Sequence, residues 1–278
     1  SHWMDMAYII TENYDSYDGF VVLHGTDTMA YSASMLSYML EGLNKPVIFT
    51  GAQLPISAMR SDARENLMTS LEIATAKSKG RPIVPEVCIF FNHMLLRGNR
   101  SKKVQSVHFD AFESENYPIL AEAGIVIDYN TTAIRTYEAN RKLVNRNNLD
   151  NGVMIVKLFP GITDKILDAC FAISGLRGVV LETYGSGNSP SLDWFMKSLE
   201  GAIKRGLILL NVSQCNGGRV IQGRYETSKE LLAVGVVSGA DMTTEAAVTK
   251  LMFLLGQKLS REEICLQLTQ SIAGEIST

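Results

Sequence analysis

Apolar residues in the first half of the chain follow two alternating patterns. Residues 19–23 and Val47–Thr50 are short continuous apolar runs, which are typical of strands buried on both faces of a sheet. Apolar positions spaced three or four apart follow each run and predict amphipathic helices over residues 28–43 and 62–76. This alternation predicts a parallel, doubly wound α/β sheet with right-handed crossovers.

One hairpin interrupts that order. Residues 86–91 and Met94–Arg97 are apolar segments on either side of Asn92 and His93, a pair suited to a two-residue turn. The helical spacing of Trp3, Met6, Ala7 and Ile10 predicts a further helix at the start of the chain.

The second half repeats the alternation of strands and helices. We expect strands at residues 153–158, 178–181 and 207–212, and helices at 163–172, 191–205, 226–234, 244–255 and 261–272. Ser260 followed by Glu263 is a capping box, which marks the start of the last helix.

A polar stretch separates the two halves. Asn, Thr, Arg and Asp dominate residues 129–151, and the apolar periodicity fades there. We therefore expect a larger N-terminal domain over residues 1–133, a linker over 134–151 and a smaller α/β domain with a parallel sheet over 152–278.

Composition favours small-molecule chemistry. The net charge is −3, and the chain lacks the excess of basic residues that is typical of nucleic-acid-binding proteins. No apolar run approaches the roughly 18 residues of a membrane span, and no signal-peptide pattern opens the chain. The histidine and cysteine spacings match no metal site, so we expect no metal and no cofactor.

Four separated cysteines, each in an apolar context, are interpreted as reduced core residues: Cys88, Cys170, Cys215 and Cys265.

The turn after the first strand is the leading site for chemistry, since ligands of such sheets bind beyond the carboxyl ends of the strands. Gly25 permits a tight turn, and Thr26 and Asp27 follow it where a helix begins. Simple helix capping by Asp27 or Thr28 is the competing interpretation, but it explains only one of these side chains.

Three later loops are further candidates for a binding or catalytic site. Residues 51–55 could offer backbone groups to a ligand, although a plain turn explains them as well. Residues 97–103 form a charged turn that would ordinarily be a solvated face, unless one lysine lies near Asp27 and takes part in proton transfer. Residues 184–190 are glycine-rich, but Pro190 stands where a dinucleotide loop needs its third glycine.

Together these segments resemble the bacterial L-asparaginase family, and are closest to its cytoplasmic, type I branch. The matching segments are GFVVLHGTDTMAYSA (19–33), KPVIFTGAQLP (45–55), RSDARENL (60–67), GNRSKK (98–103), YGSGN (184–188) and GADMTTEAAVTKL (239–251).

The resemblance implies roles for individual residues. Thr26 matches the second catalytic threonine, Asp27 its neighbouring aspartate, and Lys103 the catalytic lysine, so the three are expected to form a relay. Ala52 matches a residue whose backbone holds the scissile amide, and Asn188 an asparagine that reaches the neighbouring subunit's site. Gly25 is expected to line the same substrate site.

The resemblance also implies a threonine nucleophile in a first signature, a strand followed by a Thr-Gly-Gly-Thr-like turn. That turn is not among these 278 residues, and we expect it in a segment before Ser1. The expected reaction is hydrolysis of L-asparagine to L-aspartate and ammonia by a cytoplasmic homodimer or homotetramer. The alternatives are a glutaminase-asparaginase, the asparaginase-like subunit of a tRNA-dependent amidotransferase, and an inactive binding or assembly module.

Overall fold

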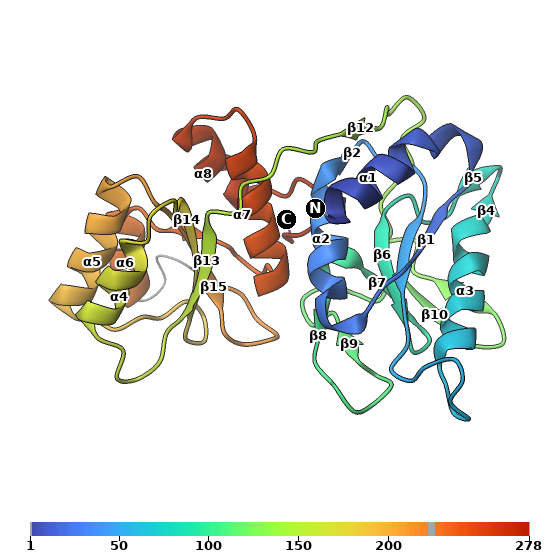
Figure 1. Ribbon diagram of the computed structural model, residues 1–278, viewed down its shortest axis with the longest axis horizontal. Coiled ribbons are helices and arrows are strands. Elements are labelled where there is room, and N and C mark those ends of the chain that lie inside the picture. Colours follow the sequence, from blue (N-terminus) through green and yellow to red (C-terminus); the bar gives the residue numbers. More distant parts are fainter. Residues whose placement is uncertain (1, 222–225, 278) are drawn as a thin grey trace. The chain divides into compact units, whose positions relative to one another are not determined.

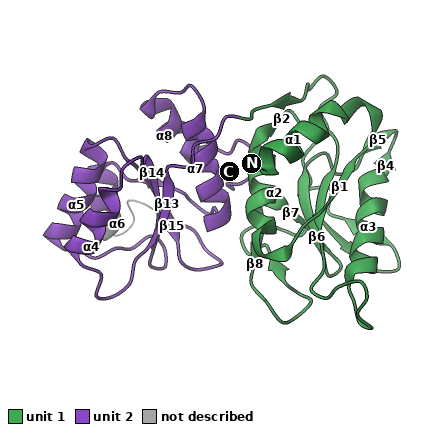
Figure 2. Ribbon diagram, in the orientation of Figure 1, with its two compact units in different colours: residues 1–147 green, residues 148–278 purple. Residues whose placement is uncertain are grey.

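The computed structural model describes residues 2–221 and 226–277. The chain forms two compact units, residues 1–147 and 148–278 (Figure 2). Each unit contains its own sheet and its own helices, and each sheet has neighbouring parallel strands, as the α/β pattern predicted. Residues 134–147, which were expected in a linker, are grouped with the first unit.

The first unit is built on a six-stranded sheet. Its strands, in spatial order, are β1 (Phe20–Leu23), β3 (Val47–Thr50), β6 (Val87–Phe91), β7 (Met94–Arg97), β10 (Ala121–Ala123) and β11 (Ile127–Tyr129). The first three strands are parallel, and the last three are added in antiparallel pairs. The predicted β6–β7 hairpin is confirmed, because Asn92 and His93 both have positive φ, as a two-residue type I′ turn requires.

Helices cover both faces of this sheet. They are α1 (His2–Glu12), α2 (Met29–Met39) and α3 (Ala63–Thr75), with α2 and α3 on opposite sides (Figure 1). Side chains alternate between the faces of a strand, so Ile48 and Phe90 share a core cluster with Ile73 of α3. β3 and β6 are buried along their whole length, which confirms the pattern of continuous apolar runs.

Two predicted features of this unit are wrong. β1 is an outer strand hydrogen-bonded to β3, and its Leu23 is 66% exposed instead of buried. The helix predicted over residues 28–43 ends at Met39. The chain then turns at Gly42, which has φ +81° and lies against the carbonyl of Lys142.

Short elements complete the first unit. They are η1 (Tyr14–Ser16), η2 (Thr26–Thr28), β2 (Leu40–Glu41), β4 (Lys77–Ser78), β5 (Arg81–Pro82), η3 (Gly98–Arg100), β8 (Lys102–Lys103), β9 (Phe112–Glu113) and β12 (Val144–Asn145). β12 pairs with β2, so part of the stretch predicted as a linker is a strand of the first unit.

The second unit has a parallel sheet in the order β13 (Val153–Lys157), β14 (Gly178–Thr183), β15 (Ile208–Ser213) and β16 (Val237–Ser238). Its helices are α4 (Asp164–Phe171), α5 (Asp193–Lys204), α6 (Glu226–Val234), α7 (Thr244–Gly256) and α8 (Arg261–Thr269). Figure 1 shows α4, α5 and α6 on one side of the sheet and α7 with α8 on the other. The predicted capping box of Ser260 and Glu263 is confirmed, although α8 ends three residues earlier than predicted.

The cysteines are free, but only Cys88 fits the predicted core position. Cys170 and Cys265 are partly exposed, and Cys215 is exposed in a loop, where its immediate neighbours Gln214 and Asn216 are polar, so the apolar context assumed for it was wrong. Among residues 2–221 and 226–277, no helix has the length and apolar character needed to cross a bilayer. The same residues contain no group of three or more His, Cys, Asp and Glu side chains able to hold a metal ion.

Candidate active site

Two turns meet at the carboxyl edge of the first unit's sheet. β1 and β3 are parallel neighbours with Leu23 opposite Thr50, so the turns that follow them lie side by side. The His24 N–H donates to the Thr50 carbonyl over 2.9 Å and extends the pairing beyond the strands. A Cβ on Gly51 would lie 2.3 Å from the His24 carbonyl oxygen, so this close approach requires glycine.

Lys103 joins the first of these turns. Its ammonium lies 2.7 Å from the Thr26 hydroxyl and 2.7 Å from one carboxylate oxygen of Asp27. The lysine belongs to β8, more than seventy residues along the chain, and its neighbour Lys102 forms neither bond. The structure therefore brings together the three side chains expected to form a relay.

Helix capping does not explain the turn. Thr28 is the residue before α2, and its side chain makes no capping hydrogen bond. The Asp27 carboxylate is paired with Lys103 instead, and it is 91% exposed whereas the lysine side chain is 17% exposed. The hydrogen bond from Lys103, followed by the attraction of its charge, lowers the pKa of the Asp27 carboxyl below its usual value. An ionised carboxylate open to solvent is able to receive a cationic group of a ligand.

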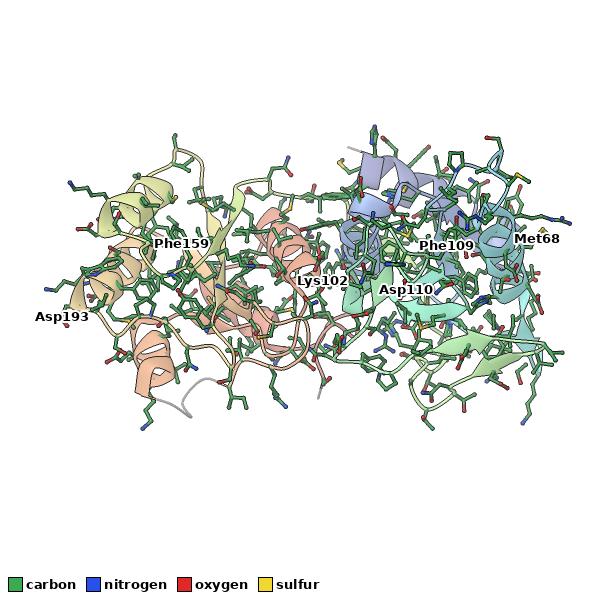
Figure 3. All side chains as sticks on the ribbon, turned by 90° about the horizontal axis from the view of Figure 1, so that it is seen from below. Met68, Lys102, Phe109, Asp110, Phe159 and Asp193 are labelled. Atoms are coloured by element: carbon green, nitrogen blue, oxygen red, sulfur yellow. The ribbon has the colours of Figure 1, made fainter. Side chains whose placement is uncertain are left out.

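The segment that presents Lys103 is held by its pairing with β9. Lys103 pairs with Phe112 across the β8–β9 ladder, and the Phe112 ring is buried at 5.2 Å from the ring of Phe91. Figure 3 labels Lys102 together with Phe109 and Asp110 of the loop that joins the two strands.

The charged turn before Lys103 is not the solvated face that such residues usually form. Arg97 and Arg100 are buried, as is Ser101, whose hydroxyl donates to the Arg97 carbonyl over 2.6 Å. Arg97 pairs with the buried carboxylate of Glu86 at 2.5 Å and also donates to the Ala133 carbonyl. This ion pair satisfies the buried charges of Arg97 and Glu86 and holds the start of the turn that leads to Lys103.

The second turn is fixed by two side chains at the start of α3 whose roles the sequence did not suggest. The Asp62 carboxylate accepts from the backbone N–H groups of Gln53 and Leu54, and makes no helix-capping bond. The Asn66 amide donates to the Gly51 carbonyl over 3.0 Å. Ala52, expected to bind substrate through its backbone, lies between these anchors. An Asp and an Asn four residues apart at a helix start were the available signal.

Gln53 links the two turns. Its side-chain oxygen accepts a long 3.4 Å hydrogen bond from the Thr26 hydroxyl, and its amide nitrogen donates to the His108 carbonyl over 2.8 Å. The Thr26 hydroxyl thus accepts from Lys103 and donates to Gln53, which orients its proton away from the lysine.

Asn188 belongs to the second unit. It lies in the turn after β14, where it forms a bridge with Tyr184 through backbone hydrogen bonds of 2.8 and 2.9 Å. Gly187 of this turn has φ +101°, and a Cβ there would lie 2.8 Å from Val220. The glycine spacing of this loop therefore serves a tight turn that presents Asn188, in agreement with the rejection of a dinucleotide loop.

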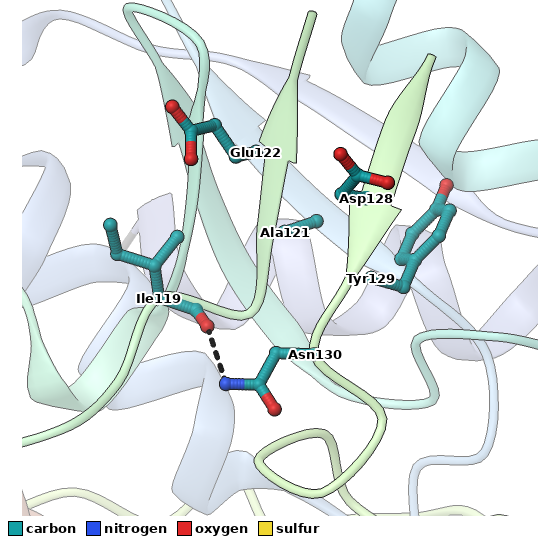
Figure 4. Close-up of a pocket in the computed structure, with 6 residues that line it drawn as sticks. All are labelled: Ile119, Ala121, Glu122, Asp128, Tyr129 and Asn130. Carbon is teal, nitrogen blue, oxygen red and sulfur yellow. Dashed lines mark hydrogen bonds between the residues drawn. The ribbon is translucent and has the colours of Figure 1, made fainter.

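A pocket of about 260 Å³ lies elsewhere in the first unit, beside β10 and β11 (Figure 4). Its carboxylates, Glu122 and Asp128, are opposite partners in the strand ladder. Burial raises the pKa of Tyr129, which also lines this pocket, to about 12. None of the residues expected to act in catalysis lines this pocket.

The arrangement of Thr26, Lys103 and Asp27 is suited to proton transfer at a hydroxyl. A lysine within hydrogen-bond distance of both a hydroxyl and a carboxylate has the geometry of a base with an orienting group. The exposed face of Asp27 and the backbone groups near Ala52 leave polar contacts for a small ligand at the same edge.

Two family models match the chain, namely "Asparaginase, N-terminal" over residues 1–135 and "Glutaminase/Asparaginase C-terminal domain" over residues 152–267. The chain is 42% identical to L-asparaginase 1 from Escherichia coli (strain K12), covering 99% of this chain and 79% of that protein. It superposes on the crystal structure of L-asparaginase I from Vibrio cholerae with a TM-score of 0.91 and 40% identity, covering 100% of this chain and 81% of that one.

The human "60 kDa lysophospholipase" is 43% identical over all of this chain, which spans about half (47%) of that relative's length. The family models, the extent of identity to the Escherichia coli enzyme and the superposed fold agree with the geometry at the sheet edge, and this chain belongs to the asparaginase family.

Proposed function

We propose that this protein is an L-asparaginase of the type I, cytoplasmic branch, which hydrolyses the side-chain amide of L-asparagine to L-aspartate and ammonia. The contact of Lys103 with both Thr26 and Asp27 is the observation that supports this most directly, because it assembles a proton-transfer relay from distant segments. The 42% identity to L-asparaginase 1 supports the choice of branch.

In the proposed mechanism a threonine attacks the amide carbon, ammonia leaves, and water hydrolyses the resulting aspartyl ester. In its neutral form, after giving up one proton, the Lys103 amine accepts the proton of the Thr26 hydroxyl and later returns it. Thr26 also positions the attacking water. The Thr26 backbone N–H helps to stabilise the oxyanion. Asp27, ionised and exposed, holds the α-ammonium group of the substrate, and Gly25 and the Ala52 backbone line the site.

The active form is proposed to be a homodimer or homotetramer. This rests on Asn188, whose counterpart in the family contributes to a neighbouring subunit's site. No cofactor or metal is assigned a step.

A panel of substrates tests the proposal with the full-length protein. Ammonia release is measured with L-asparagine and L-glutamine, and fatty-acid release with lysophosphatidylcholine. We expect L-asparagine to give the highest kcat/KM. A higher kcat/KM for glutamine would favour the glutaminase alternative, and turnover of the lipid alone would contradict the proposal.

A further inference from the structure

A chain of hydrogen bonds runs from α1 to the turn that carries Thr26. The Trp3 indole nitrogen lies 2.8 Å from the Ser32 hydroxyl of α2. That hydroxyl lies 2.9 Å from Nε2 of His24, whose Nδ1 lies 2.7 Å from the Gly25 carbonyl oxygen. All three distances are those of well-formed hydrogen bonds, and the proposed mechanism uses none of them.

The chemistry of its two ends gives this chain a direction. A carbonyl oxygen can only accept, so Nδ1 of His24 carries the hydrogen that points to Gly25. In the neutral imidazole Nε2 then accepts, and the Ser32 hydroxyl donates to it. The Trp3 indole N–H can only donate, so the Ser32 oxygen accepts a hydrogen bond from it. The network therefore selects one tautomer of His24.

This tautomer fixes the peptide between Gly25 and Thr26. A trans peptide is planar, and its carbonyl and N–H groups point in opposite directions. When His24 holds the Gly25 oxygen, the direction of the Thr26 N–H is also set. Thr26 is the first residue of η2, so its N–H has no partner inside that helix and is available to a ligand.

His24 has little freedom to release this peptide. Its ring packs edge-on against buried Phe49, with ring centroids 5.7 Å apart. Its own N–H is bound to Thr50, and its carbonyl oxygen lies against Gly51. By contrast, no atom outside the two neighbouring residues of the chain lies within 4 Å of a Cβ built on Gly25, so the space beside that glycine is open.

We propose that His24 is a positioning residue that aims the Thr26 backbone N–H at the oxyanion, and that Ser32 and Trp3 hold it in the required tautomer. This inference rests on the proposed function for its catalytic consequence, while the tautomer itself is a property of the resting protein.

Two substitutions separate this role from simple packing. In His24→Asn the amide nitrogen can occupy the place of Nδ1 and donate to Gly25, whereas in His24→Gln it reaches the place of Nε2 and leaves the Gly25 carbonyl without its donor. One oxyanion donor contributes about 100- to 1,000-fold in kcat, so losing its alignment should lower kcat about 10- to 100-fold in His24→Gln, with KM within about twofold. His24→Asn should retain kcat within about threefold.

A second pair of variants addresses the case in which a His24 variant does not fold. Ser32→Ala removes the donor to Nε2 and should lower kcat about three- to tenfold, because part of the histidine then adopts the other tautomer. Ser37→Ala is the matched control, since Ser37 lies on the same helix and bonds only to the Ala33 carbonyl among the contacts described, at 2.8 Å. It should leave kcat unchanged.

The closing experiment is ¹⁵N NMR of the complete protein together with the kinetics of these variants. His24 should show a protonated Nδ1, and the Trp3 indole signal should move in Ser32→Ala but not in Ser37→Ala, with the Trp194 signal as a reference. A protonated Nε2 in neutral His24, or equal kcat losses in His24→Asn and His24→Gln, would overturn the role of His24. Absence of asparaginase activity from the unsubstituted protein contradicts the proposed function, and the tautomer measurement shows separately whether the network exists.

Discussion

Lys103 contacts both of the other residues of the proposed relay, Thr26 and Asp27. Replacing it with methionine keeps most of the side-chain volume but removes both hydrogen bonds to Thr26 and Asp27. We expect Lys103→Met to lower kcat by about 100- to 10,000-fold, the range typical of losing a general acid or base. Steady-state ammonia release measures the effect. Lys102→Met is the control on the same short strand, and a comparable loss in that variant would assign the wrong lysine.

The pKa of Asp27 gives a second prediction at this scale. Lys103 lowers this pKa in the folded protein, so the contribution of the pair to stability is fully present above the unfolded pKa of about 3.9 and is lost as the pH falls through the lower folded value. In Lys103→Met the Asp27 pKa should rise toward its ordinary value. A carboxyl-detected NMR titration of both proteins measures the change, and an unaltered pKa would mean that the ion pair does not form in solution.

Gly51 tests the closeness of the two turns. A methyl group there would lie 2.3 Å from the His24 carbonyl, so Gly51→Ala must displace backbone and should destabilise the protein by about 1–3 kcal/mol. Gly201→Ala in α5 is the control, since the nearest atom to its Cβ belongs to the flexible Arg205 side chain. That substitution should be neutral or stabilise by up to about 1 kcal/mol. Urea unfolding of both variants measures the difference, and equal stabilities would contradict the close approach.

At the scale of elements, most of the fold was predictable because its strands and helices have different apolar periods. β3 and β6 were readable as fully buried strands, and the capping box located the start of α8. β1 has the same apolar composition but lies at the outside of its sheet, and periodicity cannot show which strand becomes an outer one.

Much of the site was also predictable, but from a sequence motif and not from apolar periodicity. The residues of the relay were found through a specific motif, but the anchors Asp62, Asn66 and Gln53 act through contacts with other segments. The buried charged turn was missed because its partner Glu86 lies eleven residues before Arg97, and sequence alone does not show that pairing.

A buried ion pair fastens the end of the chain to α7. Lys250 and Glu275 are both 0% exposed and lie 2.5 Å apart, and Lys250 also donates to the Gln270 carbonyl. Removing one partner leaves a buried charge, so Lys250→Met should destabilise the second unit by about 3–5 kcal/mol. The double variant Lys250→Met/Glu275→Leu should recover much of that loss. Chemical unfolding checks both, and equal stability of single and double variants would contradict the argument.

At the scale of the whole molecule, Asn188 and the Thr26 relay belong to different units, and the proposed oligomer predicts that subunits share their sites. Thr26→Ala and Asn188→Ala proteins should each be weakly active alone. After mixing, dissociation and reassembly, mixed oligomers should regain part of the lost activity, because some sites then receive both intact residues. The regained fraction is measured as ammonia release, with each variant reassembled alone as the control. No gain on mixing would contradict shared sites.

The most direct test of the account compares ammonia release from L-asparagine by the complete protein and by its Thr26→Ala variant, under identical conditions and with both shown to be folded. We predict rapid release by the unsubstituted protein and a loss of at least about 100-fold in kcat in the variant, because the hydroxyl held by Lys103 takes part in proton transfer. Turnover near the unsubstituted rate in Thr26→Ala would contradict the central claim.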